Sequence, residues 1–161
     1  MFAVMMAGVG AALTAVVLAS PGARVLSATV VARAAFVDPT DIKFKIDAAG
    51  QEVIHAPNAQ ETVMQQIIIG PGGHTGWHSH PGPVVVLVQG GALTFYSEDD
   101  PTCTPRTYTA GQAFVDSGQG HVHIARNLST TENLTLWATY FDVPVGGAFR
   151  LDKTYTGNCT F

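Results

Sequence analysis

Two histidine pairs, His78-Ser79-His80 and His121-Val122-His123, are the residues of this chain whose type and spacing most directly imply chemistry. Both pairs lie in sequence typical of β-strands, where residues i and i+2 project to the same side. The two imidazoles of a pair could therefore share one metal ion. Several neutral imidazoles suit zinc, iron, copper or nickel better than calcium or magnesium. The sequence thus predicts a pocket built around a transition metal.

The size and composition of the chain favour a single domain. Its 161 residues are 47% hydrophobic, which is enough to bury a sizeable core. Charged residues make up 12% of the chain and the net charge is -4, so no basic stripe is available to neutralise a phosphate backbone. Nucleic acid is therefore not an expected partner.

The distribution of turn residues predicts an all-β protein. Glycine-rich turns such as 70–73 and 118–120 separate stretches rich in β-branched residues, and no stretch after residue 24 keeps a helical period. We expect strands at 25–36, 42–46, 52–55, 62–69, 84–89, 92–96, 107–109, 113–116, 121–126 and 134–143. Many short strands predict a sandwich or barrel, in which alternate residues can line an internal ligand site.

The N-terminal segment differs from the rest of the chain. Residues 2–19 form an almost unbroken apolar run, typical of a secretory signal peptide. We expect a signal peptide at 1–20, cleaved near Ala19 or Ser20, and a secreted or extracytoplasmic domain at 21–161. A second cleavage sequence at 32–34 would remove a predicted strand. Because basic residues before the run are missing, an uncleaved membrane anchor and a buried core helix are the alternatives.

The two cysteines, Cys103 and Cys159, agree with export. Their number is even and neither belongs to a C-x-x-C motif, so a disulfide is the expected state. It would join the C-terminal tail to the loop after the central hairpin. The alternative is two unpaired cysteines that pack as small hydrophobic residues.

The histidines and glycines together resemble the two motifs of the cupins, small jelly-roll β-barrels that carry a metal between their sheets. In the first motif five residues separate a glycine from H-x-H, as residues 73–77 separate Gly72 from His78. The second motif, a glycine, a P-x-G turn, a histidine and an asparagine, is matched by Gly111, residues 118–120, His123 and Asn127, with glycine in place of proline and one extra residue before the turn. The resemblance covers about residues 36–143 and implies a single cupin-type jelly-roll β-barrel after the apolar signal segment.

The same resemblance implies that His78, His80 and His123 bind a divalent Fe, Zn, Mn, Ni or Cu ion. The glutamate that completes the cupin motif falls on Val84, or on Val85 with the longer spacing, and no acidic residue lies in that strand. We therefore expect the acidic ligand to be absent. Three neutral imidazoles would leave the ion its full positive charge, a stronger Lewis acid that favours an anionic ligand such as hydroxide, a carboxylate, an enolate or a thiolate.

The other three histidines lie outside the implied ligand set. His121 is a fourth ligand or a residue that orients substrate if the strand already begins there, and a solvent-facing turn residue if it does not. We expect His74 at the rim of the site and His55 to be structural or exposed. Without a metal, three buried imidazoles would each need a hydrogen bond, which argues against a barrel that has lost its ion.

Other polar and aromatic residues are assigned to structure. We expect Glu98, Asp99, Asp100 and Asp116 in turns or at the surface. Asn127 begins one of three N-x-S/T sequons, with Asn133 and Asn158, but we expect it to make a turn or barrel hydrogen bond. Some aromatic side chains could line an apolar pocket, although most are expected in the core: Trp77, Phe114, Trp137, Tyr140 and Phe141.

Two functions are compatible with these features. One is an enzyme with a three-histidine metal centre, dioxygenase-like with iron and hydrolytic or isomerase-like with zinc, whose substrate is a small molecule such as an anion. The other is a non-enzymatic secreted barrel that stores, senses or scavenges a metal or small ligand, because one fold serves many functions. Open sheet edges also favour a homo-oligomer.

Overall fold

The structure, a computed structural model, describes residues 21–46 and 52–161, and its regular elements are strands. They are β1 (Ala23–Ala35), β2 (Ile42–Ile46), β3 (Glu52–Ala56), β4 (Glu61–His74), β5 (His78–Ser79), β6 (Val84–Gly90), β7 (Ala92–Ser97), β8 (Arg106–Thr109), β9 (Ala113–Asp116), β10 (His123–Arg126), β11 (Leu134–Val143) and β12 (Leu151–Asp152). The expected signal peptide, residues 1–20, lies outside the described residues. Within these ranges, no helix has the length and apolar character needed to cross a membrane.

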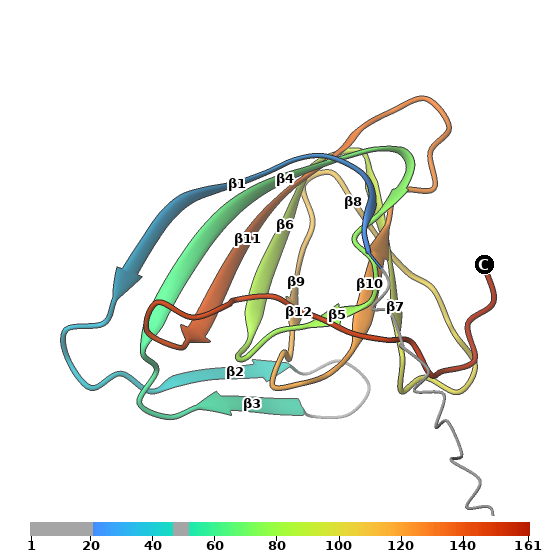
Figure 1. The fold of residues 1–161 in the computed structure, drawn as a ribbon. Coiled ribbons are helices and arrows are strands. Elements are labelled where there is room, and N and C mark those ends of the chain that lie inside the picture. The colour runs from blue at the N-terminus through green and yellow to red at the C-terminus, as the bar shows by residue number, and fades with distance from the viewer. Residues whose placement is uncertain (1–20, 47–51) are drawn as a thin grey trace, which may run out of the picture.

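The strands build a nearly closed jelly-roll barrel (Figure 1). One half carries β1, β4, β11, β6 and β9 in that order, and the other carries β8, β7, β10, β5 and β12. The two halves belong to one antiparallel sheet, joined where His74 of β4 pairs with Arg126 of β10. The separate hairpin of β2 and β3 lies across one end of the barrel (Figure 1).

The core lies between the two halves and follows the alternation of the strands. In β11, Leu134, Leu136, Ala138 and Tyr140 are buried while the residues between them are partly exposed, because successive side chains of a strand face opposite sides. These residues belong to two apolar clusters on either side of the barrel interior. The clusters are Ile69, Val88, Leu93, Ala125, Leu134 and Leu136, and Val63, Val84, Ala138, Tyr140 and Val143.

The predicted strands are found where the sequence indicated, with three differences. β4 continues to His74 through its glycines, and the two-residue strands β5 and β12 were not predicted. β10 begins at His123 rather than at residue 121. The physical reason is the preceding turn, in which Gly118, Gln119 and Gly120 have φ values of 58°, 53° and 91°. That left-handed backbone cannot pair in a sheet.

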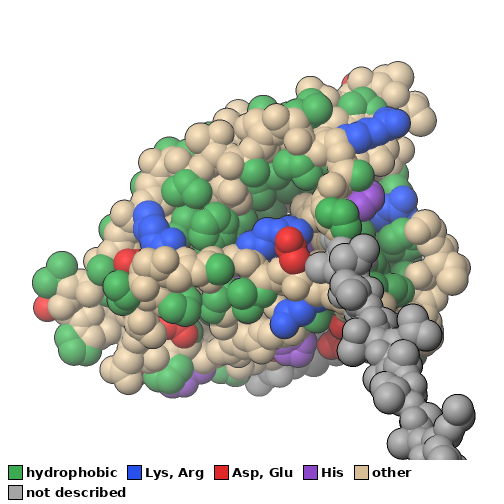
Figure 2. Space-filling model, in the orientation of Figure 1, with side chains coloured by type: hydrophobic (Ala, Val, Ile, Leu, Met, Phe, Trp, Pro, Cys, Tyr) green, Lys and Arg blue, Asp and Glu red, His purple; other side chains and the backbone are tan. Residues whose placement is uncertain are grey.

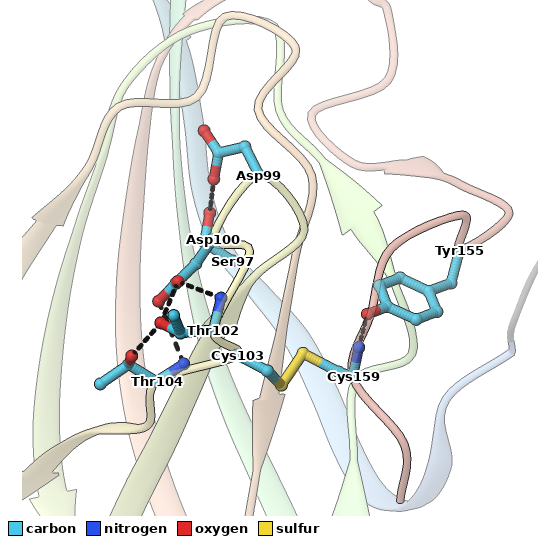
Figure 3. Close-up of a disulfide and its surroundings, with 8 residues drawn as sticks. All are labelled: Ser97, Asp99, Asp100, Thr102, Cys103, Thr104, Tyr155 and Cys159. Atoms are coloured by element: carbon cyan, nitrogen blue, oxygen red, sulfur yellow. Dashed lines mark hydrogen bonds between the residues drawn. A yellow bond between two sulfur atoms is a disulfide. The ribbon is translucent and has the colours of Figure 1, made fainter.

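Cys103 and Cys159 form the predicted disulfide, with Cα atoms 5.3 Å apart (Figure 3). The bond fastens the C-terminal segment to the loop between β7 and β8. That loop is organised by Asp100, whose carboxylate accepts hydrogen bonds from the backbone N–H groups of Thr102 and Thr104 at 2.9 and 3.0 Å. The disulfide indicates an extracytoplasmic environment.

The predicted role of Asn127 is also confirmed. Its side chain is 1% exposed and its amide donates to the backbone carbonyls of Ile69, Gly70 and Glu132 at 3.0, 3.1 and 2.8 Å. It therefore ties the end of β10 to β4 and to the start of β11.

The C-terminal segment covers the outer side of β5 and β10. Trp77, which precedes the first histidine pair, stacks on Tyr155 with ring centroids 4.0 Å apart. Trp77, Ile124 and Cys159 form a third buried cluster. The disulfide thus lies directly behind the chain segments that carry His78 and His123.

Candidate metal centre

Three histidines meet inside the barrel. His78 lies in β5, His80 follows that strand by one residue, and His123 opens β10. His78 and His123 are antiparallel partners, so their side chains share a face, and His80 shares it through the i, i+2 spacing. One ring nitrogen from each histidine lies within 4.8 Å of the other two. The three residues are 4–5% exposed. Together they form a buried group able to hold a metal ion.

Backbone carbonyls select the tautomer of two of these rings. His78 Nδ1 lies 2.8 Å from the carbonyl oxygen of Gly76, and His80 Nδ1 lies 2.7 Å from that of Phe149. A carbonyl oxygen can only accept, so each Nδ1 must carry the proton and donate it. The Nε2 atom of each ring then keeps a free lone pair, which is the form in which a histidine binds a metal.

The environment keeps the three imidazoles neutral. Burial is the main cause that lowers the pKa of His80 to about 4 and that of His123 to about 3, and it holds the pKa of His78 well below its usual value. The positive charge of Arg150 lowers all three pKa values further. The rings therefore need not lose a proton to bind a cation near neutral pH.

The three histidines line a small cavity of about 40 Å³ between the apolar clusters. Most of its wall is apolar, with contributions from Leu93, Phe95, Phe114 and Tyr140. Of the aromatic residues considered from the sequence, Phe114 and Tyr140 line this cavity. The others lie elsewhere: Trp77 stacks on Tyr155, Trp137 hydrogen-bonds Gln89, and Phe141 contacts Phe44.

A second hollow connects this cavity with the surface. His78, Tyr140 and Thr75 line both spaces, and Arg150 and Asp152 line only the outer one. Arg150 donates from Nη2 to the carbonyl of Thr75 at 2.6 Å and pairs with Asp152. Figure 2 shows hydrophobic side chains gathered in a hollow on this face, with basic and acidic side chains at its edge. Through this hollow the histidine group is reached past Arg150 and its partner Asp152. A further hollow, which His123 and Asp116 also line, carries the acidic side chains of Asp99 and Asp100.

Comparisons with known proteins found likenesses among solved structures. Neither the family models nor the curated proteins that were searched gave a match. The chain is similar to oxalate oxidase (24% identity, 50% of this chain and 41% of that chain, TM-score 0.43), to a cupin-like protein from Thermotoga maritima (24%, 48% and 55%, 0.42) and to a cupin domain from Bordetella pertussis (22%, 66% and 97%, 0.42). It spans 41% of the oxalate oxidase chain and 55% of the Thermotoga protein.

The barrel and the placement of the histidines decide the fold. The first motif places its H-x-H at β5 inside a nearly closed jelly roll, and the second places His123 directly opposite on β10. The fold is that of the cupins.

The cupin glutamate position holds an apolar residue, but a carboxylate lies beside it. Val84 is 1% exposed and pairs in register with Asp116 on the neighbouring strand β9. Asp116 is 6% exposed, so the expectation that it lies in a turn or at the surface is wrong. Its Oδ2 atom is 3.5 Å from His123 Nδ1 and 3.8 Å from His80 Nε2. Burial raises the pKa of Asp116.

From the sequence, Asp116 was assigned to a turn or the surface, because the cupin motif expects its acidic ligand within β6. The available indication was the alternation of β9, in which residues 114 and 116 share a face. Phe114 lines the cavity, so Asp116 points toward it as well. A carboxylate therefore lies beside the three histidines, although not in the strand of the cupin glutamate.

The residues present fit a metal ion. Among the described residues, Asp116 Oδ2 and His123 Nδ1 are buried polar atoms without a hydrogen-bond partner. A buried polar atom without a partner costs free energy, and a cation held between them would satisfy both. Imidazole nitrogens and a carboxylate oxygen are donors that suit zinc, iron or manganese.

The other histidines lie outside this group. The side chain of His121 is 53% exposed and its Nδ1 is 3.5 Å from Asp99, so the structure favours the turn position over a ligand position. His74 accepts a hydrogen bond at Nδ1 from the backbone N–H of Gly76 and does not line the cavity. His55 is exposed on β3 and lies near Asp41, as expected.

Proposed function

We propose that this protein is a metal-dependent cupin enzyme that acts on a small anionic molecule at His78, His80 and His123. The observation that carries the proposal is the meeting of three buried, neutral imidazoles at one cavity, two of them held by backbone carbonyls with Nε2 free. Proteins rarely bury several imidazoles together without a partner for each polar atom, because the unpaired atoms are costly.

The chemistry depends on the element bound. A divalent ion acts as a Lewis acid when bound, and iron supports dioxygen-dependent oxidation whereas zinc supports hydrolysis, hydration or isomerisation. The protein residues supply the remaining requirements. Leu93, Phe95 and Phe114 exclude water from the cavity wall, and the carbonyls of Gly76 and Phe149 hold the imidazoles in one orientation.

The substrate class is inferred from the entrance. Arg150 lines the outer hollow together with His78, and its charge acts on all three histidines. A positive group beside the entrance favours an anion such as a carboxylate. The outer hollow, of about 300 Å³, has room for a small molecule rather than a polymer. The disulfide, together with the predicted signal peptide, supports an activity outside the cytoplasm.

A non-enzymatic metal- or ligand-binding barrel is the second candidate. The observation that favours it is Asp116, since a carboxylate beside the triad could complete a coordination shell made of protein groups alone. With a four-coordinate ion such as zinc, no position would then remain open for a substrate, whereas a six-coordinate ion would keep two open positions. The two candidates differ in whether the bound ion has a coordination position that a small molecule from solution can occupy.

Elemental analysis of the purified full chain tests the proposal. We expect close to one transition metal per chain, and none in the variant His78→Ala/His80→Ala/His123→Ala. Iron would direct assays to oxygen consumption with small carboxylates, and zinc to their hydrolysis or isomerisation. Absence of metal from both proteins, after incubation with each candidate ion, would reject the proposal. Metal without any change of its spectrum on adding small anions would favour the second candidate.

A further inference from the structure

We propose that Asp116 is the fourth protein ligand of the metal, replacing the cupin glutamate from the neighbouring strand. This inference rests on the proposed function, because it requires that the three histidines bind an ion. It concerns a residue outside both cupin motifs.

The strand register brings the two positions together. Val84 and Asp116 are direct antiparallel partners, so their side chains leave the sheet on the same face, roughly 5 Å apart at Cβ. A carboxylate at residue 116 therefore enters the cavity beside the point where a glutamate at residue 84 would enter it. Val84 itself offers no ligand atom.

The polar contacts of Asp116 leave one oxygen free for a cation. Its Oδ1 accepts a hydrogen bond from the backbone N–H of Gly118 at 3.3 Å, which fixes the carboxylate at the end of β9. Its Oδ2 has no hydrogen-bond partner and faces His80 and His123. Among the described residues, no lysine or arginine forms an ion pair with it.

The distances are close to those of atoms that share an ion. Two ligand atoms about 2.1 Å from the same metal lie roughly 3.0–3.4 Å apart. Asp116 Oδ2 is 3.8 Å from His80 Nε2, the nitrogen left free by the hydrogen bond to Phe149. A rotation of the carboxylate that moves Oδ2 by about 0.4–0.8 Å would bring it into range. One carboxylate would also halve the charge of a divalent ion, so the centre would be a weaker Lewis acid than the triad alone.

A competing role is that Asp116 accepts a hydrogen bond from His123 Nδ1 and only orients that ring. The distance between these atoms is 3.5 Å and no hydrogen bond joins them. An orienting carboxylate would leave the ligand set unchanged when it is removed. The two roles therefore differ in the spectrum of the bound metal, and not only in affinity.

The test uses the full chain and four variants: Asp116→Asn, Asp116→Ala, Val84→Glu/Asp116→Ala and Asp99→Asn. Zn²⁺ affinity is measured by competition with a chelator, and the ligand set by the visible absorption of bound Co²⁺. Asp116→Asn keeps the shape of the side chain, and the double variant returns a carboxylate to the cupin position. Asp99 is the matched control, since it is 67% exposed and pairs with His121.

We expect both single Asp116 variants to lose at least ~100-fold in Zn²⁺ affinity and to change the Co²⁺ absorption. The double variant should recover more than tenfold and restore a spectrum close to that of the wild type, whereas Asp99→Asn should stay within about threefold. Circular dichroism and thermal melting of each metal-free variant verify that it folds.

Three results would overturn the inference. Unchanged affinity in Asp116→Asn would overturn it, with the proposed function intact. A weaker affinity with an unchanged Co²⁺ spectrum and no recovery in the double variant would overturn it in favour of an orienting role. Failure of the wild-type chain to bind Zn²⁺ or Co²⁺ would reject the proposed function and this inference with it.

Discussion

The two histidine pairs have the same H-x-H pattern but differ in burial and in backbone conformation. In His78-Ser79-His80 both imidazoles are buried and belong to the triad. In His121-Val122-His123 only the second is buried, while the first is 53% exposed beside Asp99. The first pair is extended from the start of β5, whereas the second straddles the boundary between a left-handed turn and β10. An H-x-H pair shares a face only where both of its residues have extended backbone.

The surroundings reinforce this difference. His123 stacks on Phe95 with ring centroids 4.9 Å apart and has Asp116 beside it. His121 is held instead by the turn, where its N–H donates to the carbonyl of Gly118 at 3.0 Å. Because His123 is buried among aromatic and ionisable groups, it is a candidate ligand for a metal. His121 is exposed and is a surface residue.

The largest effect should come from comparing the members of the second pair. We expect His123→Ala to weaken metal binding by at least ~10³-fold, because it removes a donor from the buried group. His121→Ala should change it by less than about threefold. Chelator competition with Zn²⁺ measures both. A similar loss in the two variants would contradict the separation of the pair that the structure shows.

The turn that precedes the second pair can be disrupted by substituting its glycines. An added Cβ at Gly118 would lie 1.8 Å from the carbonyl oxygen of Gly82, while at Gly120 it would meet no atom within 4 Å. Both residues have positive φ, so both substitutions also strain the backbone. We expect Gly118→Ala to lower the free energy of unfolding by at least ~3 kcal/mol and Gly120→Ala by about 1 kcal/mol. Urea denaturation of the metal-free proteins gives both values, and equal costs would contradict the close approach.

The disulfide supports both triad-bearing segments from behind. Cys159 packs with Trp77 and Ile124, the chain neighbours of His78 and His123. We expect Cys103→Ala/Cys159→Ala to lower the free energy of unfolding by ~2–4 kcal/mol while metal content stays near that of the wild type. Denaturation and elemental analysis measure the two quantities. Loss of the metal in a variant that still folds would show that the disulfide positions the histidines as well.

The stability of the metal-free chain should also depend on pH. His80 and His123 have folded pKa values of about 4 and about 3, below the usual 6.5. Between each folded value and 6.5, the unfolded chain therefore binds more protons than the folded chain. The free energy of unfolding therefore falls as pH decreases from about 6.5 toward 4, by up to ~1.4 kcal/mol per pH unit for each group.

Asp116 acts in the opposite sense, since its raised pKa stabilises the folded chain at low pH and this contribution is lost as pH rises through the folded value. The comparison is therefore made with His80→Ala/His123→Ala, which keeps Asp116. We expect this variant to show a shallower dependence of stability on pH between about 4 and 6.5. Equal slopes would contradict the burial of neutral imidazoles.

Much of the fold was predictable because it depends on local patterns. The alternation in residues 134–143 and the glycine turns gave the positions of most strands, since period and turn residues act within a few positions. The two-residue strands β5 and β12 were missed because they contain too few residues to show a period. They become strands only through their partners, as when Leu151 pairs with Ser79.

The candidate site was predictable in part. His78, His80 and His123 are brought together as the motifs implied, and the disulfide forms as the cysteine count indicated. Asp116 was missed because its contribution depends on pairing between β6 and β9, which the spacing within one strand does not reveal.

The sequence by itself determined the residue types available for chemistry and the strand periods that carry them. Three histidines at motif spacing, an apolar core and an even number of cysteines are properties of the chain alone. The tertiary structure decided which of these residues share one space. Burial of Asp116 and exposure of His121 arise from the register of β9 on β6 and from the left-handed turn before β10, and both are set by contacts between distant segments.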